Sequence, residues 1–508
     1  MKKITAPLLI ICTLLLNLLA GCDGLDENYS TNPNHRLSFS TDTLSFDTVF
    51  TTIGSATKQF MVYNKNDEPL NIERIIQASP ATSGFRINVD GRKGDNFDNV
   101  RIAAKDSMYI FVEVTVNPTG KDQPLLIQDS IRFSCNNITQ TVLLEACGQD
   151  VKLIKGGQTL NEDTRLTAER PYLIYDSLMI DKGITVHIEE GTILYMHDKA
   201  KVIVDGTLIA EGTKDNPIIF RGDRLDFILD DLLPYDRTPG QWEGLIFKKE
   251  SFNNIFNNVI VRNGNNGITC EASDPEKSKL KINNSQITNM DGNVLTAINC
   301  NIEATNSEFT NATIDVVLLN GGKYSFTHCT LANYISAKPR YSLAQEGLPS
   351  FTLRLLDNTV DKYYNEIGPY DLLQANFDNC IIDGSLGAGK EIEISMGTKA
   401  TPLRNNNLKY HFNHCVVMAD QIDSENFTDV IFVKGEKDNK MEYRTNGGKP
   451  NKYMYDFRPD KETTPGVGKA DLFISQKYPI DRNGVNRLTN NGPDIGAYEF
   501  VALEEDEK

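Results

Sequence analysis

The sequence predicts an all-β protein, in which a β-sandwich precedes a solenoid of parallel strands. The first observation is a repeat between Lys281 and Leu331, where three segments alternate apolar and polar residues. Small residues at equivalent places in these segments, Ser285, Ser307 and Cys329, are spaced 22 residues apart. The second observation is a series of alternating runs between residues 37 and 150, each bounded by Asn, Asp, Gly or Pro. Period-2 alternation without a sustained 3.6-residue period indicates strands rather than helices.

The repeat length identifies the kind of solenoid. A period of roughly 20–30 residues marks units that bury their apolar faces against neighbouring units. At ~3.3 Å per strand residue, about 22 residues form three short strands with their turns, which is one coil of a right-handed parallel β-helix. The fixed leucine pattern of a leucine-rich repeat is absent. We therefore expect ladders of equivalent residues: a polar ladder of Asn284, Asn306, His328, Asn379 and His414, and a ladder of small residues, Ser285, Ser307, Cys329, Cys380 and Cys415.

Composition limits the partners. The formal net charge is −17 with a pI near 4.9, which excludes nucleic acid because its binding needs a basic surface. A polyanionic ligand is disfavoured, although a local basic groove remains compatible with this charge. Of nine cysteines, Cys12 and Cys22 belong to the leader, and the remaining seven cannot all pair. We expect Cys135 and Cys147 to stay unpaired, because a hairpin turn at Asn136 places them too far apart for a disulfide.

The first 36 residues are read as an export signal and a tether. Lys2 and Lys3 precede an apolar run that is too short for a membrane-spanning helix, so residues 1–21 are expected to be a signal peptide. Leu19-Ala20-Gly21-Cys22 resembles the lipobox of bacterial lipoproteins, which implies acylation of Cys22 with palmitate-type chains and anchoring in the outer membrane. Residues 22–36 form the tether. Its acidic start, Asp23–Glu27, resembles a surface-export signal and favours the cell surface over a periplasm-facing position.

Residues 37–150 are expected to form an immunoglobulin-like β-sandwich, since about seven short strands fit into some 110 residues. The order of the strands resembles the ASH and major-sperm-protein type of domain. Val62-Tyr63-Asn64 precedes Pro69–Ile72, the strand Ile110–Val116 leads into Asn117-Pro118, and Val142–Gly148 closes the domain. The resemblance implies a spacer or docking module.

Residues 153–500 are expected to form the right-handed parallel β-helix. Leu178–Val186 followed by Glu190–Ile193 resembles the opening coils of bacterial β-helix proteins. The ending, Tyr478–Arg487 followed by Pro493–Glu499, resembles the C-terminal signature of β-helix proteins of the choice-of-anchor Q type. We expect a structural cap over the last coil, in which Arg487 pairs with Asp494 above Tyr498. The insertions that interrupt the coils span residues 223–240, 336–371, 387–407 and 435–464.

The insertions and the single tryptophan supply the candidate ligand-binding residues. Long loops on a rigid scaffold commonly carry function, and aromatic side chains suit glycan or protein ligands. The candidates are Trp242, Tyr341, Tyr363, Tyr364 and Tyr370. Trp242 serves either as a sugar platform or in packing. Asp226, Asp230 and Asp231 are weak candidates for Ca²⁺, without the spacing of an EF-hand, and no other cofactor is expected.

No catalytic constellation emerges from the sequence. A glycoside hydrolase needs converging carboxylates, and a polysaccharide lyase needs a base and a group that neutralises the uronate. His328 and His414 share one ladder position, which favours stacked structural histidines over a catalytic pair or metal ligands. We therefore expect a non-catalytic envelope protein for binding or adhesion, directed at glycan. The alternatives are a polysaccharide lyase or glycoside hydrolase on the helix face, and a structural subunit of an envelope complex. The ligand and the oligomeric state stay open.

Overall fold

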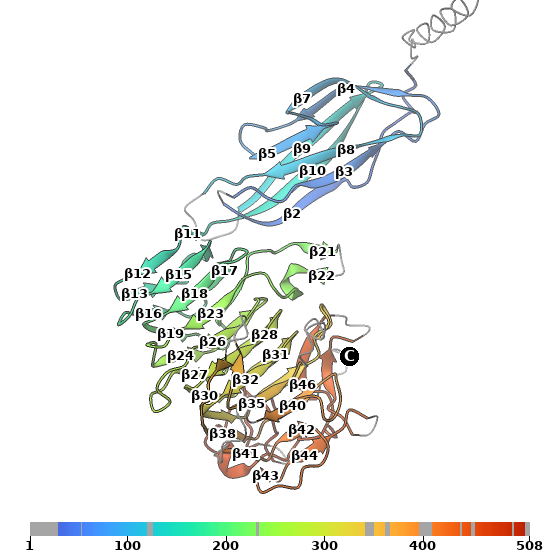
Figure 1. Cartoon of the computed structure of the whole chain (residues 1–508). Helices are drawn as coiled ribbons and strands as arrows, with labels where there is room; N and C mark the ends of the chain where they lie inside the picture. The colour runs from blue at the N-terminus through green and yellow to red at the C-terminus, as the bar shows by residue number, and fades with distance from the viewer. Residues whose placement is uncertain are drawn as a thin grey trace, which may run out of the picture. The chain divides into compact units, whose positions relative to one another are not determined.

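The chain is essentially all-β and consists of two compact units, Met1–Asp150 and Val151–Lys508 (Figure 1). The computed structural model describes residues 29–51, 53–118, 125–229, 233–340, 350–360, 366–395, 409–436, 439–448, 453–489 and 492–502. The expected signal peptide, Cys22 and the first part of the tether, residues 22–28, therefore lie outside the described residues. Within the described ranges, no helix has the length and apolar character needed to span a membrane.

The first unit is an immunoglobulin-like β-sandwich of two five-stranded sheets. One sheet contains, in spatial order, β1 (Ser38–Phe39), β3 (Lys58–Tyr63), β8 (Ser107–Val114), β5 (Phe85–Val89) and β6 (Arg92–Gly94). The other contains β2 (Thr43–Phe50), β10 (Ile138–Gln149), β9 (Leu125–Cys135), β4 (Leu70–Gln77) and β7 (Asn96–Ile102). Alternate residues point inward, so Val62, Ile72 and Ile110 are completely buried between the sheets. β2 pairs with β10 in parallel, whereas the other pairings of the sandwich are antiparallel.

The hairpin between β9 and β10 confirms the prediction for two cysteines. Asn136 and Asn137 both have positive φ, 53° and 61°, as a tight turn between two strands requires. Cys135 pairs across the turn with Ile138, whereas Cys147 lies opposite Leu126 at the far end of the hairpin. Both thiols are free, as are the other five cysteines in the described part of the chain.

The second unit is a right-handed parallel β-helix whose strands form three sheets, and each coil contributes a strand to each sheet along most of its length. The first sheet contains β11 (Lys152–Ile154), β14 (Tyr172–Ile174), β17 (Ile193–Met196), β20 (Ile218–Gly222), β25 (Val259–Arg262), β28 (Gln286–Met290), β31 (Glu308–Ala312), β34 (Thr330–Asn333), β39 (Ile381–Gly384), β42 (Val416–Met418) and β44 (Ile431–Val433). The second sheet contains β12 (Gln158–Leu160), β15 (Ser177–Ile180), β18 (Lys201–Val204), β23 (Gly244–Phe247), β26 (Ile268–Cys270), β29 (Leu295–Ile298), β32 (Val317–Asn320), β35 (Leu353–Leu356) and β40 (Ile392–Ser395).

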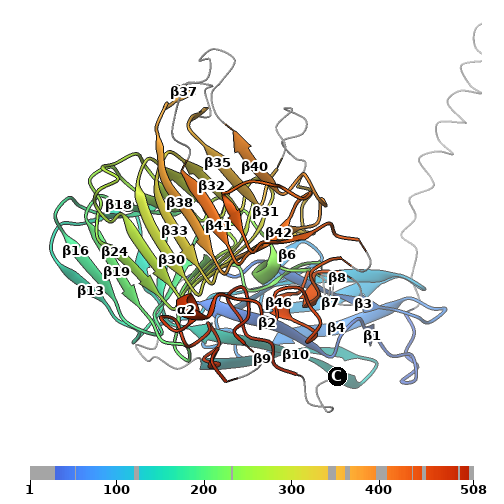
Figure 2. The same ribbon diagram turned by 90° about the horizontal axis from the view of Figure 1, so that it is seen from below.

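The third sheet contains β13 (Thr164–Leu166), β16 (Thr185–Ile188), β19 (Thr207–Glu211), β24 (Asn254–Asn257), β27 (Leu280–Asn283), β30 (Asn301–Thr305), β33 (Gly322–Thr327), β38 (Leu372–Asp378), β41 (Tyr410–Asn413) and β43 (Phe427–Thr428), which lie side by side in Figure 2. Outside the coils are the two-stranded pairs β21 (Phe227–Leu229) with β22 (Leu233–Pro234), β36 (Thr359–Val360) with β37 (Glu366–Ile367), and β45 (Tyr443–Asn446) with β46 (Tyr455–Pro459). Short helices span Tyr235–Arg237 (η1) and Leu472–Ser475 (α2).

The strand register reproduces the 22-residue period. Ile282 pairs with Ala304, and Ala304 pairs with Phe326. Each coil turns from the third sheet into the first through one residue with positive φ, between 46° and 53°, at all the predicted rungs: Asn284, Asn306, His328, Asn379 and His414. Asparagine tolerates this left-handed conformation better than most residues, which explains its recurrence. We call this row, which Asn258 extends by one coil, the corner ladder.

The predicted ladder of small residues lies inside the corner, where a large side chain would not fit. Ser285, Ser307, Cys329, Cys380 and Cys415 are all completely buried. The Ser307 hydroxyl accepts the Ser285 N–H at 3.1 Å, so the serines bridge successive coils. Deeper in the core, the rings of Phe377, Phe412 and Phe427 stack with centroids 4.8 and 4.9 Å apart. The stacked order of equivalent side chains fixes the rise from coil to coil.

Candidate functional site

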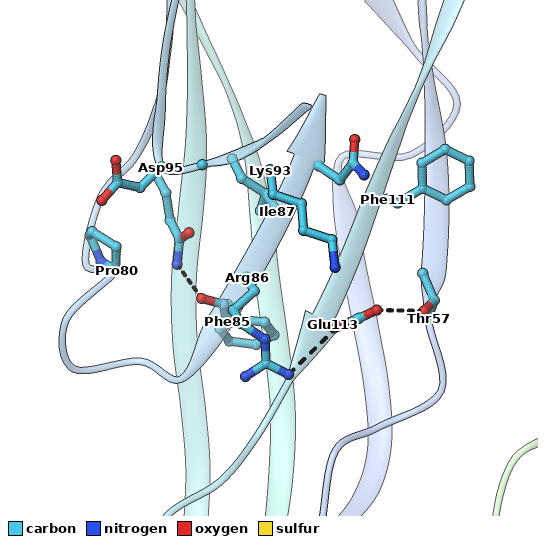
Figure 3. Close-up of a pocket in the computed structure, with 12 residues that line it drawn as sticks. Thr57, Pro80, Phe85, Arg86, Ile87, Lys93, Asp95, Phe111 and Glu113 are labelled. Carbon is cyan, nitrogen blue, oxygen red and sulfur yellow. Dashed lines mark hydrogen bonds and ion pairs between the residues drawn. The ribbon is translucent and has the colours of Figure 1, made fainter. Parts of the chain in front are cut away.

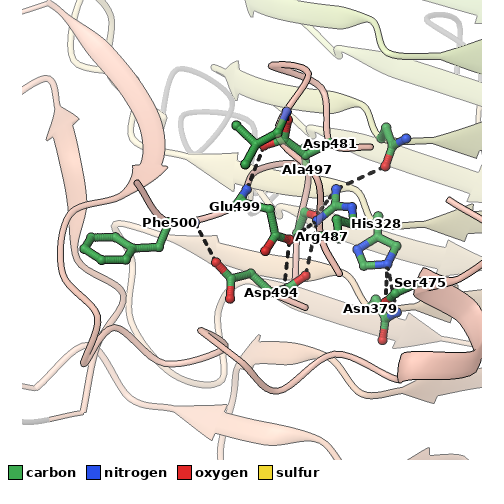
Figure 4. A network of polar contacts seen from close by, with 12 residues as sticks. His328, Asn379, Ser475, Asp481, Arg487, Asp494, Ala497, Glu499 and Phe500 are labelled. Atoms are coloured by element: carbon green, nitrogen blue, oxygen red, sulfur yellow. Dashed lines mark hydrogen bonds and ion pairs between the residues drawn. The ribbon is translucent and has the colours of Figure 1, made fainter. Parts of the chain in front are cut away.

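Residues 471–500, which we call the C-terminal segment, lie along the corner ladder. The Asn379 amide accepts the Asp471 N–H at 2.7 Å, and the His328 Nε2 lies 3.0 Å from the Ser475 hydroxyl (Figure 4). The Asn306 amide donates to the Ile480 carbonyl at 3.0 Å. Three successive rungs therefore hold the segment against the side of the solenoid. Burial, followed by the nearby Arg487 charge, keeps the pKa of His328 well below its ordinary value, so this imidazole is neutral.

A buried arginine organises the C-terminal segment, but its partner differs from the predicted one. Arg487 is completely buried, and its Nη1 lies 2.7 Å from the Glu499 carboxylate. It also donates to the carbonyl of Gly496 and to the side chain of Asn306, each at 3.1 Å. The predicted pair of Arg487 with the Asp494 carboxylate is wrong, because that carboxylate already accepts the backbone N–H groups of Gly468 and Phe500. Only the Asp494 carbonyl contacts Arg487, at 3.4 Å.

The predicted position of this structure is also corrected. The Tyr498 hydroxyl donates to Glu308 on β31, and the Ala497 N–H donates to the Thr330 hydroxyl on β34 at 3.0 Å. These strands lie within the first sheet, whereas its last strand is β44. The C-terminal segment therefore covers the flank of several coils instead of the end of the solenoid. A row of polar corner residues offers it hydrogen bonds that the apolar end of the core cannot offer.

Two adjoining cavities lie between the C-terminal segment and the coils, and we call them together the lateral groove. The larger has a volume of about 760 Å³ and is bounded by the first sheet, the β45–β46 hairpin and the C-terminal segment. The smaller, of about 340 Å³, lies over the corner ladder at Asn258, Asn284 and Asn306. Lys214 and Arg482 line both cavities. The groove thus runs from the corner across the outer face of the first sheet.

The smaller cavity exposes the rungs that the C-terminal segment leaves free. Asn258 and Asn284 are both half-buried. Their amides donate to neighbouring coils, Asn258 to the Gly212 carbonyl at 3.2 Å and Asn284 to the Asn257 side chain at 3.3 Å. The Asn258 amide also donates to the Asn257 side chain at 3.4 Å, so only its carbonyl oxygen remains for a ligand. Asn284 retains a second N–H and its carbonyl oxygen, since an amide carries two donors and an acceptor.

The carboxylates of the larger cavity are already bonded; Glu308 and Glu499 are buried, and Asp456 is half-buried. Glu308 is 3% exposed and accepts hydrogen bonds from Gln286 and Thr310, each at 2.9 Å, besides that from Tyr498. Burial raises the pKa of Glu499 to about 7 in spite of its contact with Arg487. Asp456 holds the Arg458 guanidinium at 2.9 Å. These acids build the groove walls.

A buried aspartate ties the hairpin wall to the solenoid. The hydroxyls of Tyr334 and Tyr443 both donate to Oδ2 of Asp383, each at 2.8 Å. Asp383 is completely buried on β39, and burial raises its pKa to about 7. Because Tyr443 belongs to β45, this contact fixes the strand pair that carries Arg444 and Tyr455 into the groove.

The sandwich unit has a separate hollow of about 600 Å³ beside β5 and β6 (Figure 3). Some of its polar side chains are already bonded. Gln77 donates to the Phe85 carbonyl at 3.0 Å, and the Thr57 hydroxyl donates to Glu113 at 3.0 Å. Arg86 faces the same Glu113 carboxylate at 3.6 Å. Asn88 and Lys93 line the same hollow, and the Asn88 Oδ1 is buried without a hydrogen-bond partner in the described part of the chain. The lateral groove has more polar and charged side chains in its lining, so it is the stronger candidate.

The residues selected from the sequence do not gather at one place. Trp242 is completely buried, with its indole N–H donating to the Arg262 carbonyl at 2.9 Å, so its role is packing and it cannot be a sugar platform. Tyr370 is half-buried near Gly321, away from the groove residues. Asp226 is paired with Arg224. Tyr341, Tyr363, Tyr364, Asp230 and Asp231 lie outside the described residues. Among the residues with described positions, no group of three His, Cys, Asp or Glu side chains is arranged to hold a metal ion.

Several groove residues escaped sequence reasoning. Lys214 lies in a short connection between β19 and β20, and Arg444 lies in the insertion at 435–464, from which no ligand-binding candidate was selected. Glu308 alone carried a usable signal. It occupies the position of Gln286 and Thr330 in adjacent coils, so an acid interrupts an otherwise neutral row.

Comparisons with known proteins leave the family open. No family model matches the chain, and no curated protein matches it. The structural neighbours include a family 123 glycoside hydrolase from Clostridium perfringens, at 8% identity over 22% of this chain and 26% of that one, with a TM-score of 0.16. They also include the ASH/PapD-like domain 7 of human CEP192, at 8% identity over 26% of this chain and 96% of the domain (TM-score 0.17). A third is the periplasmic chaperone SfaE, at 11% identity over 24% of this chain and 61% of that one (TM-score 0.15).

Proposed function

We propose that this protein is a lipid-anchored lipoprotein of a Gram-negative outer membrane, exposed at the cell surface, that binds glycan without catalysis in the lateral groove. The observation that carries the proposal is the groove itself, where free rungs of the corner ladder adjoin cationic and aromatic side chains. The lipobox-like Leu19–Cys22 and the acidic residues after it support the anchor and the surface location. The choice-of-anchor Q-like ending supplies one wall of the groove.

The groove suits a saccharide chain. Sugar hydroxyls both donate and accept hydrogen bonds, and asparagine and glutamine amides do the same. Asn258, Asn284 and Gln286 present such amides on neighbouring coils, which stack at a regular spacing of ~4.8 Å. Tyr455 adds a half-buried ring for the apolar face of a sugar, and its hydroxyl is held by Ser336 at 2.8 Å. A repeating polymer matches a repeating row of amides.

A polysaccharide lyase or glycoside hydrolase is the alternative. The contact of Tyr498 with Glu308 favours it, since a tyrosine and a carboxylate side by side can move a proton. Against it, hydrolysis needs two available carboxylates, and Glu308, Glu499 and Asp456 are each engaged by donors of the wall. Binding is therefore the better reading of the same residues.

The test is a glycan array probed with a soluble form of the chain that begins at Asp23 and therefore lacks residues 1–22. Binding and release of products would be measured together, with and without Ca²⁺. The informative variant is Asn284→Gly, which removes a rung amide while glycine keeps the positive φ. Asn299→Gly is its matched control, because Asn299 also has positive φ and does not line the groove.

Binding without products that weakens in Asn284→Gly and persists in Asn299→Gly is the expected result. Shortened or unsaturated products would replace the proposal with the enzyme. If neither binding nor product release is detected, glycan binding is contradicted and a structural subunit of an envelope complex is favoured.

A further inference from the structure

We infer that the glycan bound by the lateral groove is acidic and that its carboxylates contact Lys214, Arg444 and Arg482. The inference rests on the proposed function and names the chemical class of its ligand. It begins from a contrast in charge. The whole chain carries a net charge of −17, yet the charged groups that a ligand can reach in this groove are mainly cationic. Lys214 is exposed, and Arg444 and Arg482 are half-buried.

The acids of the groove do not cancel these cations at the solvent boundary. Glu308, Asp481 and Glu499 are all at most 3% exposed. Among the described residues, Asp456 is the one half-buried acid in the lining of the larger cavity, and it is paired with Arg458 at 2.5 Å. Asp481 accepts the N–H groups of Asn483 and Glu499 at 2.8 Å, so its lone pairs are turned inward. Glu499 and Glu308 have the partners given above. The groove therefore presents surplus donors, and a ligand must bring the acceptors.

Arg482 is a single side chain with more hydrogen-bond donors than partners. One of its terminal nitrogens donates to the Tyr498 hydroxyl at 2.9 Å. Its Nε is buried and has no hydrogen-bond partner among the described residues. A buried donor without a partner is costly and calls for an explanation. A planar guanidinium recognises a carboxylate through two parallel hydrogen bonds, so an acidic sugar would satisfy this group.

Lys214 is placed where the two cavities join. Its ammonium lies beside Gly484, where the Cβ of any larger residue would approach within 3.3 Å of Nζ. Gly484 has a φ of 84°, which non-glycine residues rarely adopt. The C-terminal segment thus leaves room for the cation at the junction. Arg444 lies on the opposite wall, where one Nη donates to the Val501 carbonyl at 2.7 Å and further donors remain.

The three cations come from separate walls of one groove, which distinguishes this surface from a basic patch for nucleic acid. Lys214 belongs to a coil connection, Arg444 to the hairpin and Arg482 to the C-terminal segment. A chain with acidic groups at intervals meets them in turn, whereas a neutral glycan leaves their charges without partners. Arg444 and Arg482 are half-buried, which reduces screening by salt, so their contacts contribute more than an exposed ion pair, whereas Lys214 is exposed.

The experiment compares acidic glycans with their own neutral forms on the mature chain. An array of oligogalacturonate, alginate, hyaluronan and sialylated oligosaccharides would be probed beside the methyl-esterified form of each. Sulfated oligosaccharides form a further arm, which separates carboxylate recognition from a general preference for anions. The Kd of the tightest pair would then be measured by calorimetry at two salt concentrations.

We expect the acid to bind at least about ten-fold more tightly than its ester, with the difference shrinking at high salt. Lys214→Gln and Arg444→Gln should each remove about ten-fold of the acid's affinity and leave the ester unchanged. Lys281→Gln is the control, since Lys281 lies on the third sheet and pairs with Glu303 at 3.2 Å.

The other outcomes are distinct. Equal binding of acid and ester that is still lost in Asn284→Gly would overturn the acidic ligand and keep the proposed glycan function. Preference for sulfated forms alone would overturn the assignment of carboxylate. Absence of binding to every acid and every ester would contradict both the inference and the proposed function.

Discussion

The buried pair of Arg487 and Glu499 provides the most direct test of how the groove is held. Replacement by Arg487→Met keeps an unbranched, apolar stem and removes the guanidinium with its charge. Glu499 then loses a contact at 2.7 Å in a site where both side chains are at most 1% exposed. Hydrogen bonds to the Gly496 carbonyl and the Asn306 amide are lost as well. The C-terminal segment should detach from the corner ladder while the coils stay folded.

The expected cost is about 3–5 kcal/mol, which is the usual effect of leaving one charge of a buried pair without its partner. Glu499 limits this cost by taking up a proton, since its pKa is already about 7 and rises further without the arginine. The double variant Arg487→Met/Glu499→Gln removes the unpaired charge and should recover part of the loss. Arg165→Met is the control, because Arg165 meets Glu189 at 3.1 Å on the surface and should contribute under about 1 kcal/mol.

Native-state hydrogen exchange of peptides from residues 472–489 and 492–500 measures the opening of this segment. Protection should fall by about two to three orders of magnitude in Arg487→Met, while peptides from β15 and β18 stay unchanged. A fall of less than about ten-fold would refute the view that this pair holds the segment. An equal loss of protection in all coils would show instead that the arginine supports the whole solenoid.

Three further predictions concern other parts of the β-helix. The carboxyl of Asp383, with its pKa raised from 3.8 to about 7, stabilises the fold fully below about pH 4, and this contribution of about 4 kcal/mol at most disappears as the pH rises through 7. Asp383→Asn should therefore flatten the fall of Tm between pH 4 and 8. Asn284→Val should cost about 1–2 kcal/mol at its positive φ, and Asn284→Gly much less, by chemical denaturation. Because Trp242, the single tryptophan, is completely buried, its fluorescence should be blue-shifted, should resist quenching by iodide and should not change when glycan is added.

The solenoid could be predicted from the sequence because its geometry is local and repeated. Residues such as Ser285 and Ser307 occupy the same place in consecutive coils, so one spacing determines sheet, corner and core at once. The positive φ at Asn306 follows from the same repetition, since a β-helix must turn in each coil. The sandwich was similarly accessible through the alternation of its strands.

The groove was inaccessible because it depends on contacts between distant parts of the chain. The sequence offers Arg487 two nearby acids, Asp494 and Glu499, as possible partners. Only the backbone path of the segment determines that the Asp494 carboxylate accepts backbone N–H groups and that the Glu499 carboxylate contacts the guanidinium. The role of Trp242 was ambiguous for a similar reason, since the side chain of a residue at the start of a coil can point into the core or toward solvent. Nothing in the local sequence places Lys214 beside Arg482, which lies more than two hundred residues later.

The position of the C-terminal segment also sets an order of events during biosynthesis. Each coil needs only its predecessor, so the solenoid can grow while the chain is still emerging. Tyr498, by contrast, reaches back 190 residues to Glu308, and Asn306 waits for Ile480 over 174 residues. The lateral groove thus forms last, after the coils that it lies against have been made. A chain that is cut short before this segment would still form coils, yet it would lack the groove.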